Sequence, residues 1–197
     1  MLLWVQLLNS TITRMGLMTE PGGYAGRMLG KDYQRQDCSL ARALEVVGER
    51  WTLLIVRDAF YGVRRFNDFQ AHLDIPKAVL SDRLNGLVED GILERRPDPR
   101  HAGRHLYELT PAGRDLWPAL HALLAWGDRH RYPSSRVYTH AACGTTLDAS
   151  GLCATCGQTP GPEDIVMTLR PGRGRLRDDP VAAALRAPHR LLEPVET

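Results

Sequence analysis

The chain has 197 residues, 43% of them hydrophobic and 24% charged, and its formal net charge is only +2. This length and composition are typical of a globular protein with one medium domain and room for a small appendage. Residues 38–130 contain 13 basic and 13 acidic side chains. Overall charge therefore does not favour nucleic acid, and any such affinity must come from where individual charges lie.

Residues 1–36 carry the weakest pattern. The apolar run from Leu2 to Leu8 has no basic segment before it and is too short to cross a bilayer. Met15 and Met18 are compatible with a later start of translation, and several glycines indicate a flexible leader. We expect no membrane segment and a cytoplasmic protein.

Two helices are predicted after the leader. Asp37 or Ser39 can cap the first, and Gly48 ends it. The second follows Trp51 and is apolar around most of its circumference up to Phe60. Such a helix is expected at the centre of a core.

A helix-turn-helix pattern comes next. Phe66, Phe69 and Leu73 recur at helical spacing over about two turns. After a turn containing proline, the period restarts over about residues 76–90, and Gly91 ends it. The face opposite the apolar stripe of this second helix carries Lys77, Ala78, Ser81 and Asp82. We expect this face to contact bases in the major groove, with a plain solvated helix face as the alternative.

The following segment has the pattern of a hairpin. Residues 92–96 and 106–109 alternate as strands do, and residues 97–104 between them are turn-forming and basic. This predicts a wing beside the recognition helix. Cationic residues expected at phosphates or in the minor groove are Arg64, Arg65, Arg83, Arg100, His101 and Arg104. Exposed turn charge is the alternative for the wing, and a carboxylate partner within the fold is the alternative for Arg83.

A long helix over about residues 111–130 is predicted last in this domain. Thr110 can cap it, and Pro111 suits its first position because a missing N–H is harmless there. Its apolar residues are Leu116, Leu120, Leu123, Leu124 and Trp126. One small domain can hardly bury all of them, so we expect a homodimer through this helix, although it could instead fold back on its own domain.

These blocks, taken together, resemble the HxlR-type winged helix-turn-helix regulators, relatives of the MarR group. The resemblance covers roughly residues 38–131 and lies in residues 38–44, 48–54, 65–69, 79–84 and 106–113. It implies a mainly α fold with a small β-wing and a dimeric bacterial transcription factor that binds operator DNA and is not an enzyme. The start of the recognition helix departs from the family because it lacks the usual polar cap, which leaves that role to Asp74.

Cys38 lies at the predicted start of the first helix. Helix N-termini favour a thiolate, and the resemblance suggests that a cysteine near this position senses oxidants or electrophiles. An inert or packed thiol is the alternative, which the sequence leaves open.

A second set of cysteines lies beyond the winged domain. His140 and Cys143 form an H-x2-C pair, and after nine residues Cys153 and Cys156 form a C-x2-C pair, each pair followed by glycine. Two such knuckles can hold a structural zinc ion within a zinc-ribbon-like β segment. A disulfide, a C-x2-C redox couple and a catalytic zinc are the alternatives.

The sequence thus divides into four segments. They are a leader (1–36), a winged domain (37–131), a zinc-ribbon-like segment (136–170) and a basic tail (171–197) that we expect to be disordered. The tail could add contacts to DNA phosphates or do nothing specific. A protein- or RNA-interaction module is the alternative function. An enzyme is disfavoured because no nucleophile with its base, no paired carboxylates and no phosphate-binding loop is recognisable.

Overall fold

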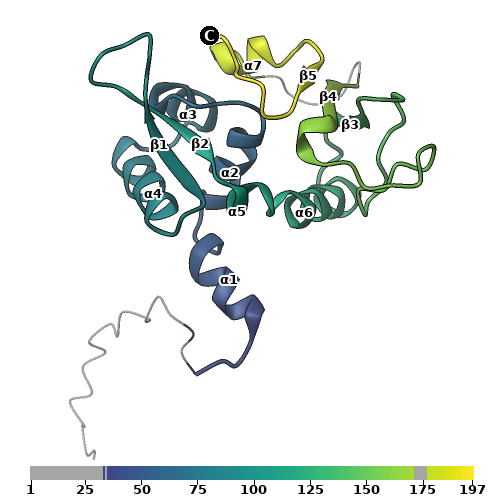
Figure 1. Cartoon of the computed structure of the whole chain (residues 1–197), viewed down its shortest axis with the longest axis horizontal. Helices are drawn as coiled ribbons and strands as arrows, with labels where there is room; N and C mark the ends of the chain where they lie inside the picture. Colours follow the sequence, from purple (N-terminus) through teal and green to yellow (C-terminus); the bar gives the residue numbers. More distant parts are fainter. Residues whose placement is uncertain (1–32, 34, 171–176) are drawn as a thin grey trace, which may run out of the picture. The chain divides into compact units, whose positions relative to one another are not determined.

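The computed structural model describes residues 33, 35–170 and 177–197, which belong to one compact unit. The expected leader lies almost entirely outside the described residues. The helices are α1 (Ser39–Val47), α2 (Thr52–Phe60), α3 (Phe66–Leu73), α4 (Lys77–Glu89), α5 (Pro111–Arg114), α6 (Trp117–His130) and α7 (Pro180–Ala184). The strands are β1 (Leu93–Pro97), β2 (His105–Leu109), β3 (Arg136–His140), β4 (Ile165–Leu169) and β5 (His189–Arg190). We call α1 to α6 with β1 and β2 the winged domain, β3 to β4 the ribbon, and residues 177–197 the C-terminal segment (Figure 1).

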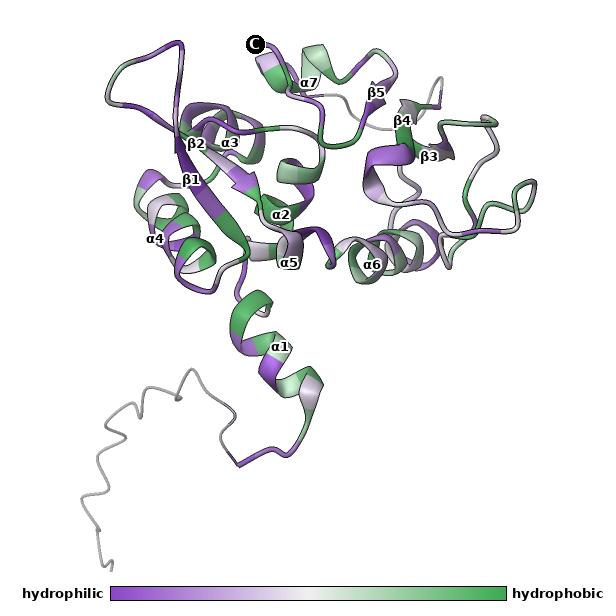
Figure 2. Cartoon of the chain, in the orientation of Figure 1, coloured by the Kyte–Doolittle hydropathy of each residue, from purple (hydrophilic) through white to green (hydrophobic). Residues whose placement is uncertain are grey.

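The first two helices follow the predicted pattern, with one correction. Gly48 ends α1 by donating its N–H to Leu44 O, as expected. The N-cap of α1 is Cys38, however, and no side chain caps the helix, so neither Asp37 nor Ser39 has the predicted role. As predicted, α2 lies at the centre of the core (Figure 2), with most of its residues buried.

The turn between α3 and α4 differs from the sequence-based expectation. Asp74 adopts the left-handed conformation, with φ of 54°, and its N–H bonds to Gln70 O. It therefore closes α3 and does not cap α4. The N-cap of α4 is Pro76, whose extended backbone redirects the chain without a side-chain cap. The apolar face of α4 is buried through Leu80, Leu84 and Leu87, as expected.

The wing forms as predicted. β1 and β2 pair in antiparallel register from Leu93 opposite Leu109 to Pro97 opposite His105. At the tip, the Asp98 N–H donates to Arg104 O, which closes the loop. Figure 1 shows the hairpin beside α3 and α4. Most of β1 is hydrophilic, with apolar character only at its first residue (Figure 2).

The predicted long helix is two helices. Thr110 caps α5 by accepting the Gly113 N–H at 3.1 Å, and Pro111 occupies the first turn, as expected. α5 nevertheless ends after one turn, and α6 begins at Trp117. Pro118 explains the break, because a proline has no N–H for the preceding turn and is tolerated only at a helix start.

The ribbon is packed against the winged domain within one hydrophobic core. The predicted β segment over residues 136–170 does contain two strands, and β3 pairs with β4 in antiparallel register from residues 136 and 169 to residues 140 and 165. The Trp117 ring of α6 contacts Phe60 in a tilted arrangement and Tyr138 edge-to-face, with ring centroids 5.1 and 5.4 Å apart. Residues 133–135 are therefore a short connection between packed parts of one core.

The C-terminal segment corrects the expectation of a disordered tail, although residues 171–176 lie outside the described part. α7 packs against α3, and β5 adds to β4 as a third antiparallel strand. The last residues then run along the winged domain, where Val195 donates its N–H to Gly62 O. Gly62 has φ of +83°, and a Cβ there would lie 1.7 Å from Glu193 O. Only glycine allows this close approach.

Candidate DNA-binding surface and metal centre

The outward face of α4 has the exposure that a recognition helix needs. Lys77, Ala78 and Asp82 are exposed in its first turns, and Ser81 beside them is half-buried. The opposite face of the helix is fixed in the core, so these side chains are presented by a rigid element. These four residues were predicted from the sequence, and in the structure they lie together in the first turns of α4.

The arginines at the base of the wing, Arg64 and Arg65, form ion pairs and hydrogen bonds within the protein. The Arg64 guanidinium lies 2.9 Å from Glu108 and donates at 3.1 Å to Leu192 O of the C-terminal segment. Arg65 lies 3.3 Å from the carboxylate of Asp98. Both arginines are half-buried. These contacts hold α3 against the wing. Both arginines therefore have a structural role in the fold.

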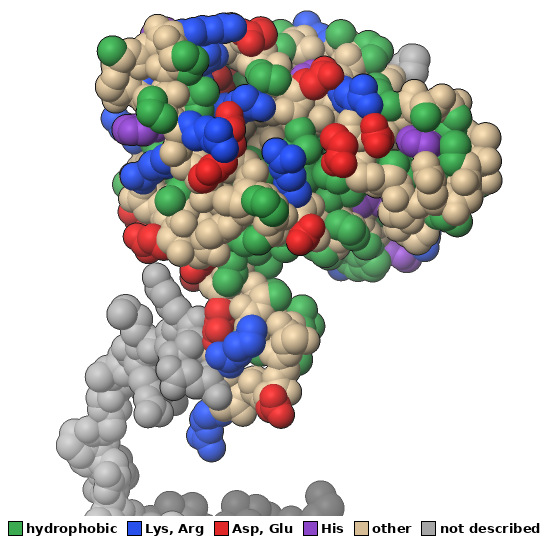
Figure 3. Space-filling view, viewed as in Figure 1, with side chains coloured by type: hydrophobic (Ala, Val, Ile, Leu, Met, Phe, Trp, Pro, Cys, Tyr) green, Lys and Arg blue, Asp and Glu red, His purple; other side chains and the backbone are tan. Residues whose placement is uncertain are grey.

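Two other predicted contacts also have internal partners. Arg83 forms an ion pair with Glu49 at 2.9 Å, which is the alternative considered for it. Arg100 forms one at 2.5 Å with Glu196 of the C-terminal segment. The predicted wing cation that has no side-chain partner within the described part of the chain is Arg104, which is exposed. Figure 3 accordingly shows basic and acidic side chains interspersed on the visible face.

Asp98 organises the tip of the wing, although it was not among the residues predicted to have a role there. Its carboxylate is 1% exposed and accepts hydrogen bonds from the Arg100 N–H at 2.8 Å and from Arg65 at 3.3 Å. The His101 ring lies 3.1 Å away. The Arg100 N–H contributes most to lowering the pKa of this carboxyl group, so Asp98 stays ionised and fixes the loop. Its position between two prolines was the signal in the sequence.

The cysteine and histidine cluster has the geometry of a metal centre. The ligand atoms of His140, Cys143, Cys153 and Cys156 all lie within 4.8 Å of one another. Cys143 Sγ is 3.4 Å from Cys153 Sγ and 3.5 Å from His140 Nδ1. Tetrahedral zinc with Zn–S bonds of about 2.3 Å places ligand atoms about 3.8 Å apart. The four residues therefore fit such an ion without rearrangement of the backbone.

Each half of the cluster is a tight turn of the same kind. Gly144 donates its N–H to His140 O, and Gly157 donates its N–H to Cys153 O, both at 2.8 Å. Both glycines have positive φ, +71° and +66°, which other residues rarely adopt. The glycine after each ligand pair thus allows the chain to turn tightly there.

The thiols in the cluster differ in acidity. Hydrogen bonds from Thr145 lower the pKa of Cys143 to about 6. Hydrogen bonding with Cys143 raises the pKa of Cys156 to about 11. One thiolate therefore forms easily, and its charge opposes ionisation of the next, which is the repulsion that a bound cation removes.

Cys38 and several apolar side chains lie at the surface. The Cys38 thiol is exposed at the N-cap of α1, and the other three cysteines all belong to the metal cluster.

Large apolar side chains are exposed on two helices. On α6, Leu123 and Trp126 are 53% and 52% exposed. On α1, Leu40 and Leu44 are 63% and 40% exposed. Apolar exposure on two helices is typical of a surface that another protein covers.

This combination of a helix-turn-helix, an outward second helix and a two-stranded wing defines a winged-helix DNA-binding protein. None of the described helices is long and apolar enough to cross a membrane. Residues 46–135 match the family model described as HxlR-like helix-turn-helix. The chain is 45% identical over 140 residues to the HTH-type transcriptional regulator Rv3095 of Mycobacterium tuberculosis, itself uncharacterised, a match that covers 69% of this chain and 87% of that relative.

Two further similar proteins are also described as regulators of transcription. The HTH-type regulator YdeP of Bacillus subtilis, also uncharacterised, is 28% identical over 109 residues, which is 53% of this chain and 85% of YdeP. The crystal structure of PA1607, a candidate transcription factor, is 33% identical with a TM-score of 0.54, and the match covers 74% of this chain and 98% of that one. The chain belongs to the HxlR-like helix-turn-helix family and is a transcriptional regulator, not an enzyme.

Proposed function

We propose that the protein reads operator DNA with α4 in the major groove and the wing against the adjacent backbone. The observation that carries the proposal is the outward face of α4, where Lys77 and Asp82 are exposed while the opposite face is locked in the core. A lysine can donate to guanine, and Ser81 can reach a base or a phosphate. A protein with this activity works in the cytoplasm, where the DNA is.

The wing adds a smaller set of contacts than its arginine content suggests. Arg104 is exposed and available for a phosphate, with His101 beside it. Arg64, Arg65, Arg83 and Arg100 have carboxylate partners, so each would have to exchange an internal ion pair for a phosphate. We therefore expect Lys77 and Arg104 to dominate the electrostatic part of the affinity.

The protein acts as a homodimer in this proposal. Leu123 and Trp126 on α6 and Leu40 and Leu44 on α1 leave two apolar faces open. Covering them with a second copy removes that surface from water and presents two α4 helices to two half-sites.

A structural zinc ion held by His140, Cys143, Cys153 and Cys156 completes the ribbon. The donor set, the separations and the paired turns all suit four-coordinate zinc. Four protein ligands leave no open position for chemistry, so the ion would stabilise the loops between β3 and β4.

Cys38 is the candidate redox or electrophile sensor. Its thiol is exposed at the N-cap of α1, where an oxidant or electrophile can reach it. It lies on the same helix as exposed Leu40 and Leu44, so its modification would alter a face that the proposed dimer covers.

The test is binding of the full chain to DNA from upstream of its own coding region, measured by fluorescence anisotropy over a range of salt concentrations. Specific binding should weaken steeply with salt, and Lys77→Ala should reduce the affinity at least tenfold. Arg186→Ala, an exposed arginine on the C-terminal segment, is the matched control and should change little. Absence of sequence-specific binding, or equal effects of the two variants, would reject this mode of reading. Preferential binding of RNA would support the interaction-module alternative.

A further inference from the structure

A cavity of about 410 Å³ lies between the winged domain and the ribbon. α2 and α6 form one wall, and the other consists of β3, the loop after it and Arg170. Its volume is in the range of pockets that hold small organic ligands. The family model ends at residue 135, so much of this cavity consists of residues outside the shared winged domain.

The walls suit a flat, largely apolar molecule. Two aromatic rings, those of Tyr61 and Tyr138, line the cavity, together with the aliphatic side chains of Leu124, Val137 and Leu147. The tyrosine hydroxyl groups bond to each other at 2.6 Å, so both rings are fixed in place. Tyr61 is fully buried behind the wall and Tyr138 is 9% exposed, so a planar ligand can lie against a rigid apolar wall without reorganising it.

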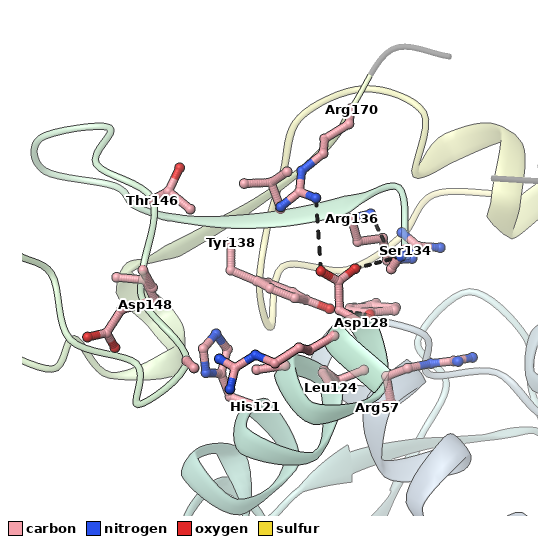
Figure 4. A pocket seen from close by; sticks show the side chains of 16 residues that line it. Arg57, His121, Leu124, Asp128, Ser134, Arg136, Tyr138, Thr146, Asp148 and Arg170 are labelled. Atoms are coloured by element: carbon pink, nitrogen blue, oxygen red, sulfur yellow. Dashed lines mark hydrogen bonds and ion pairs between the residues drawn. The ribbon is translucent and has the colours of Figure 1, made fainter. Parts of the chain in front are cut away.

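The carboxylates that line the cavity already have partners. Asp128 accepts the Ser134 N–H at 2.6 Å and lies 4.0 Å from Arg170 (Figure 4). Asp148 accepts the N–H groups of Ser150 and Leu152 and the Ser150 hydroxyl group. Neither carboxylate requires a cation from a ligand.

Two of the four arginines that line the cavity, Arg129 and Arg136, are less well satisfied. Arg136 is half-buried, and its guanidinium group lies over the Tyr61 ring at 4.7 Å and, within the described residues, donates only to Met167 Sδ, at 3.1 Å. Neither Arg136 nor Arg129 pairs with a carboxylate within the described residues. A partly buried guanidinium group without an anion is a receptor for a carboxylate, which it can bind in bidentate geometry.

His121 adds a polar contact point. Its side chain lines the cavity and is 5% exposed, and its Nδ1 atom is buried with no hydrogen-bond partner in the described part of the chain. Buried polar atoms are normally satisfied, so this atom points to a group that the protein itself does not provide. Burial lowers the pKa of His121, which leaves the ring neutral and able to bond with an uncharged polar group.

We propose that this cavity is a binding site for a small organic carboxylate with a planar apolar body, held at its carboxylate by Arg136 and at a second polar group by His121. Figure 4 shows both residues around the same space, with Tyr138 between them. The ligand would bridge α2 and α6 of the winged domain to the ribbon. A role of this ligand as an effector rests on the proposed function, whereas binding of the ligand to the cavity does not.

The test is isothermal titration calorimetry of the full chain without DNA, with 2-naphthoate and its neutral analogue 2-naphthamide as probes. We expect 2-naphthoate to bind at one site per chain, at least tenfold more tightly than the amide. Arg136→Gln should reduce that preference below threefold, whereas Arg131→Gln, an exposed arginine outside the cavity, should leave it unchanged.

A second variant keeps the test decisive if Arg136→Gln does not fold. Ala125→Trp places a large ring inside the cavity from α6, and it should abolish binding of both probes while circular dichroism shows unchanged helical content. Equal binding of acid and amide, no binding of 2-naphthoate at millimolar concentration, or binding that survives Ala125→Trp would overturn the proposal. Each of these results could occur in a protein that still binds operator DNA. Failure of this proposal can therefore be distinguished from failure of the proposed function.

Discussion

The hydroxyl oxygens of Tyr61 and Tyr138 lie 2.6 Å apart, and this buried hydrogen bond joins α2 of the winged domain to β3 of the ribbon. Burial raises the pKa of Tyr138 well above its usual value, so its hydroxyl group stays protonated. Tyr138 also makes edge-to-face contacts with Trp117 and His121 of α6. The two parts are therefore held together by directional contacts in addition to apolar burial.

Replacing Tyr138 with phenylalanine should test this junction. Tyr138→Phe leaves the Tyr61 hydroxyl group buried without its partner, and the free energy of unfolding should fall by about 1–3 kcal/mol. Urea denaturation followed by circular dichroism measures the change. Tyr132→Phe is the control, because Tyr132 is 60% exposed and should lose nothing measurable. If the double variant Tyr61→Phe with Tyr138→Phe is as unstable as the two single effects added together, the pair is not coupled.

Metal binding should require the His140, Cys143, Cys153 and Cys156 cluster and should not require Cys38. Protein purified without chelator should contain one zinc ion per chain by elemental analysis, and EDTA should lower its melting temperature. Cys156→Ser should lose the metal with little direct packing loss, because Cys156 is exposed. Cys38→Ser is the matched control and should retain a full equivalent. The zinc assignment is wrong if the wild-type protein contains none.

The C-terminal segment should restrain the wing. Glu196→Gln removes the ion pair that occupies Arg100 and frees this arginine for a phosphate. Because exposed ion pairs are worth at most about 1 kcal/mol, operator affinity should rise up to about fivefold, with a steeper salt dependence. Fluorescence anisotropy at several salt concentrations measures both. Glu193→Gln carries the same charge change in the same segment, and equal effects of the two variants would mean that only net charge matters.

The open apolar face of α6 should be the dimer contact. Trp126→Glu and Leu123→Glu each place a charge on this face, and either should convert a dimer into a monomer because burying an unpaired carboxylate is costly. Light scattering coupled to gel filtration reports the mass. Ala183→Glu, at an exposed position of α7, should leave the mass unchanged. A dimer that persists in both α6 variants would place the interface elsewhere.

Cys38 should confer sensitivity to oxidants or electrophiles if it is a sensor. Operator affinity of the wild-type protein should change at least threefold after treatment with hydrogen peroxide or an aldehyde. Cys38→Ser should lack that response, whereas any response through the metal-cluster cysteines would persist in it. Identical behaviour of wild type and variant under both challenges would exclude a sensing role for Cys38.

Local patterns in the sequence determined the elements of the winged domain and the ligand set of the ribbon. The face of α4 follows from helical spacing, since residues three and four apart share a side. The wing follows from alternation around a turn, and the metal cluster from two ligand pairs with a glycine after each. The break before α6 was not predicted, because the continuous apolar stripe indicated one long helix across Pro118.

Only the tertiary structure decided which distant parts meet. Tyr61 and Tyr138 are 77 residues apart in the sequence, and Gly62 meets the C-terminal segment at the opposite end of the chain. No periodic pattern encodes such contacts, because they depend on how separately formed surfaces fit together and on the closure of long loops. For the same reason, the internal partners of Arg64 and Arg100 and the cavity around His121 became visible only once the chain was folded.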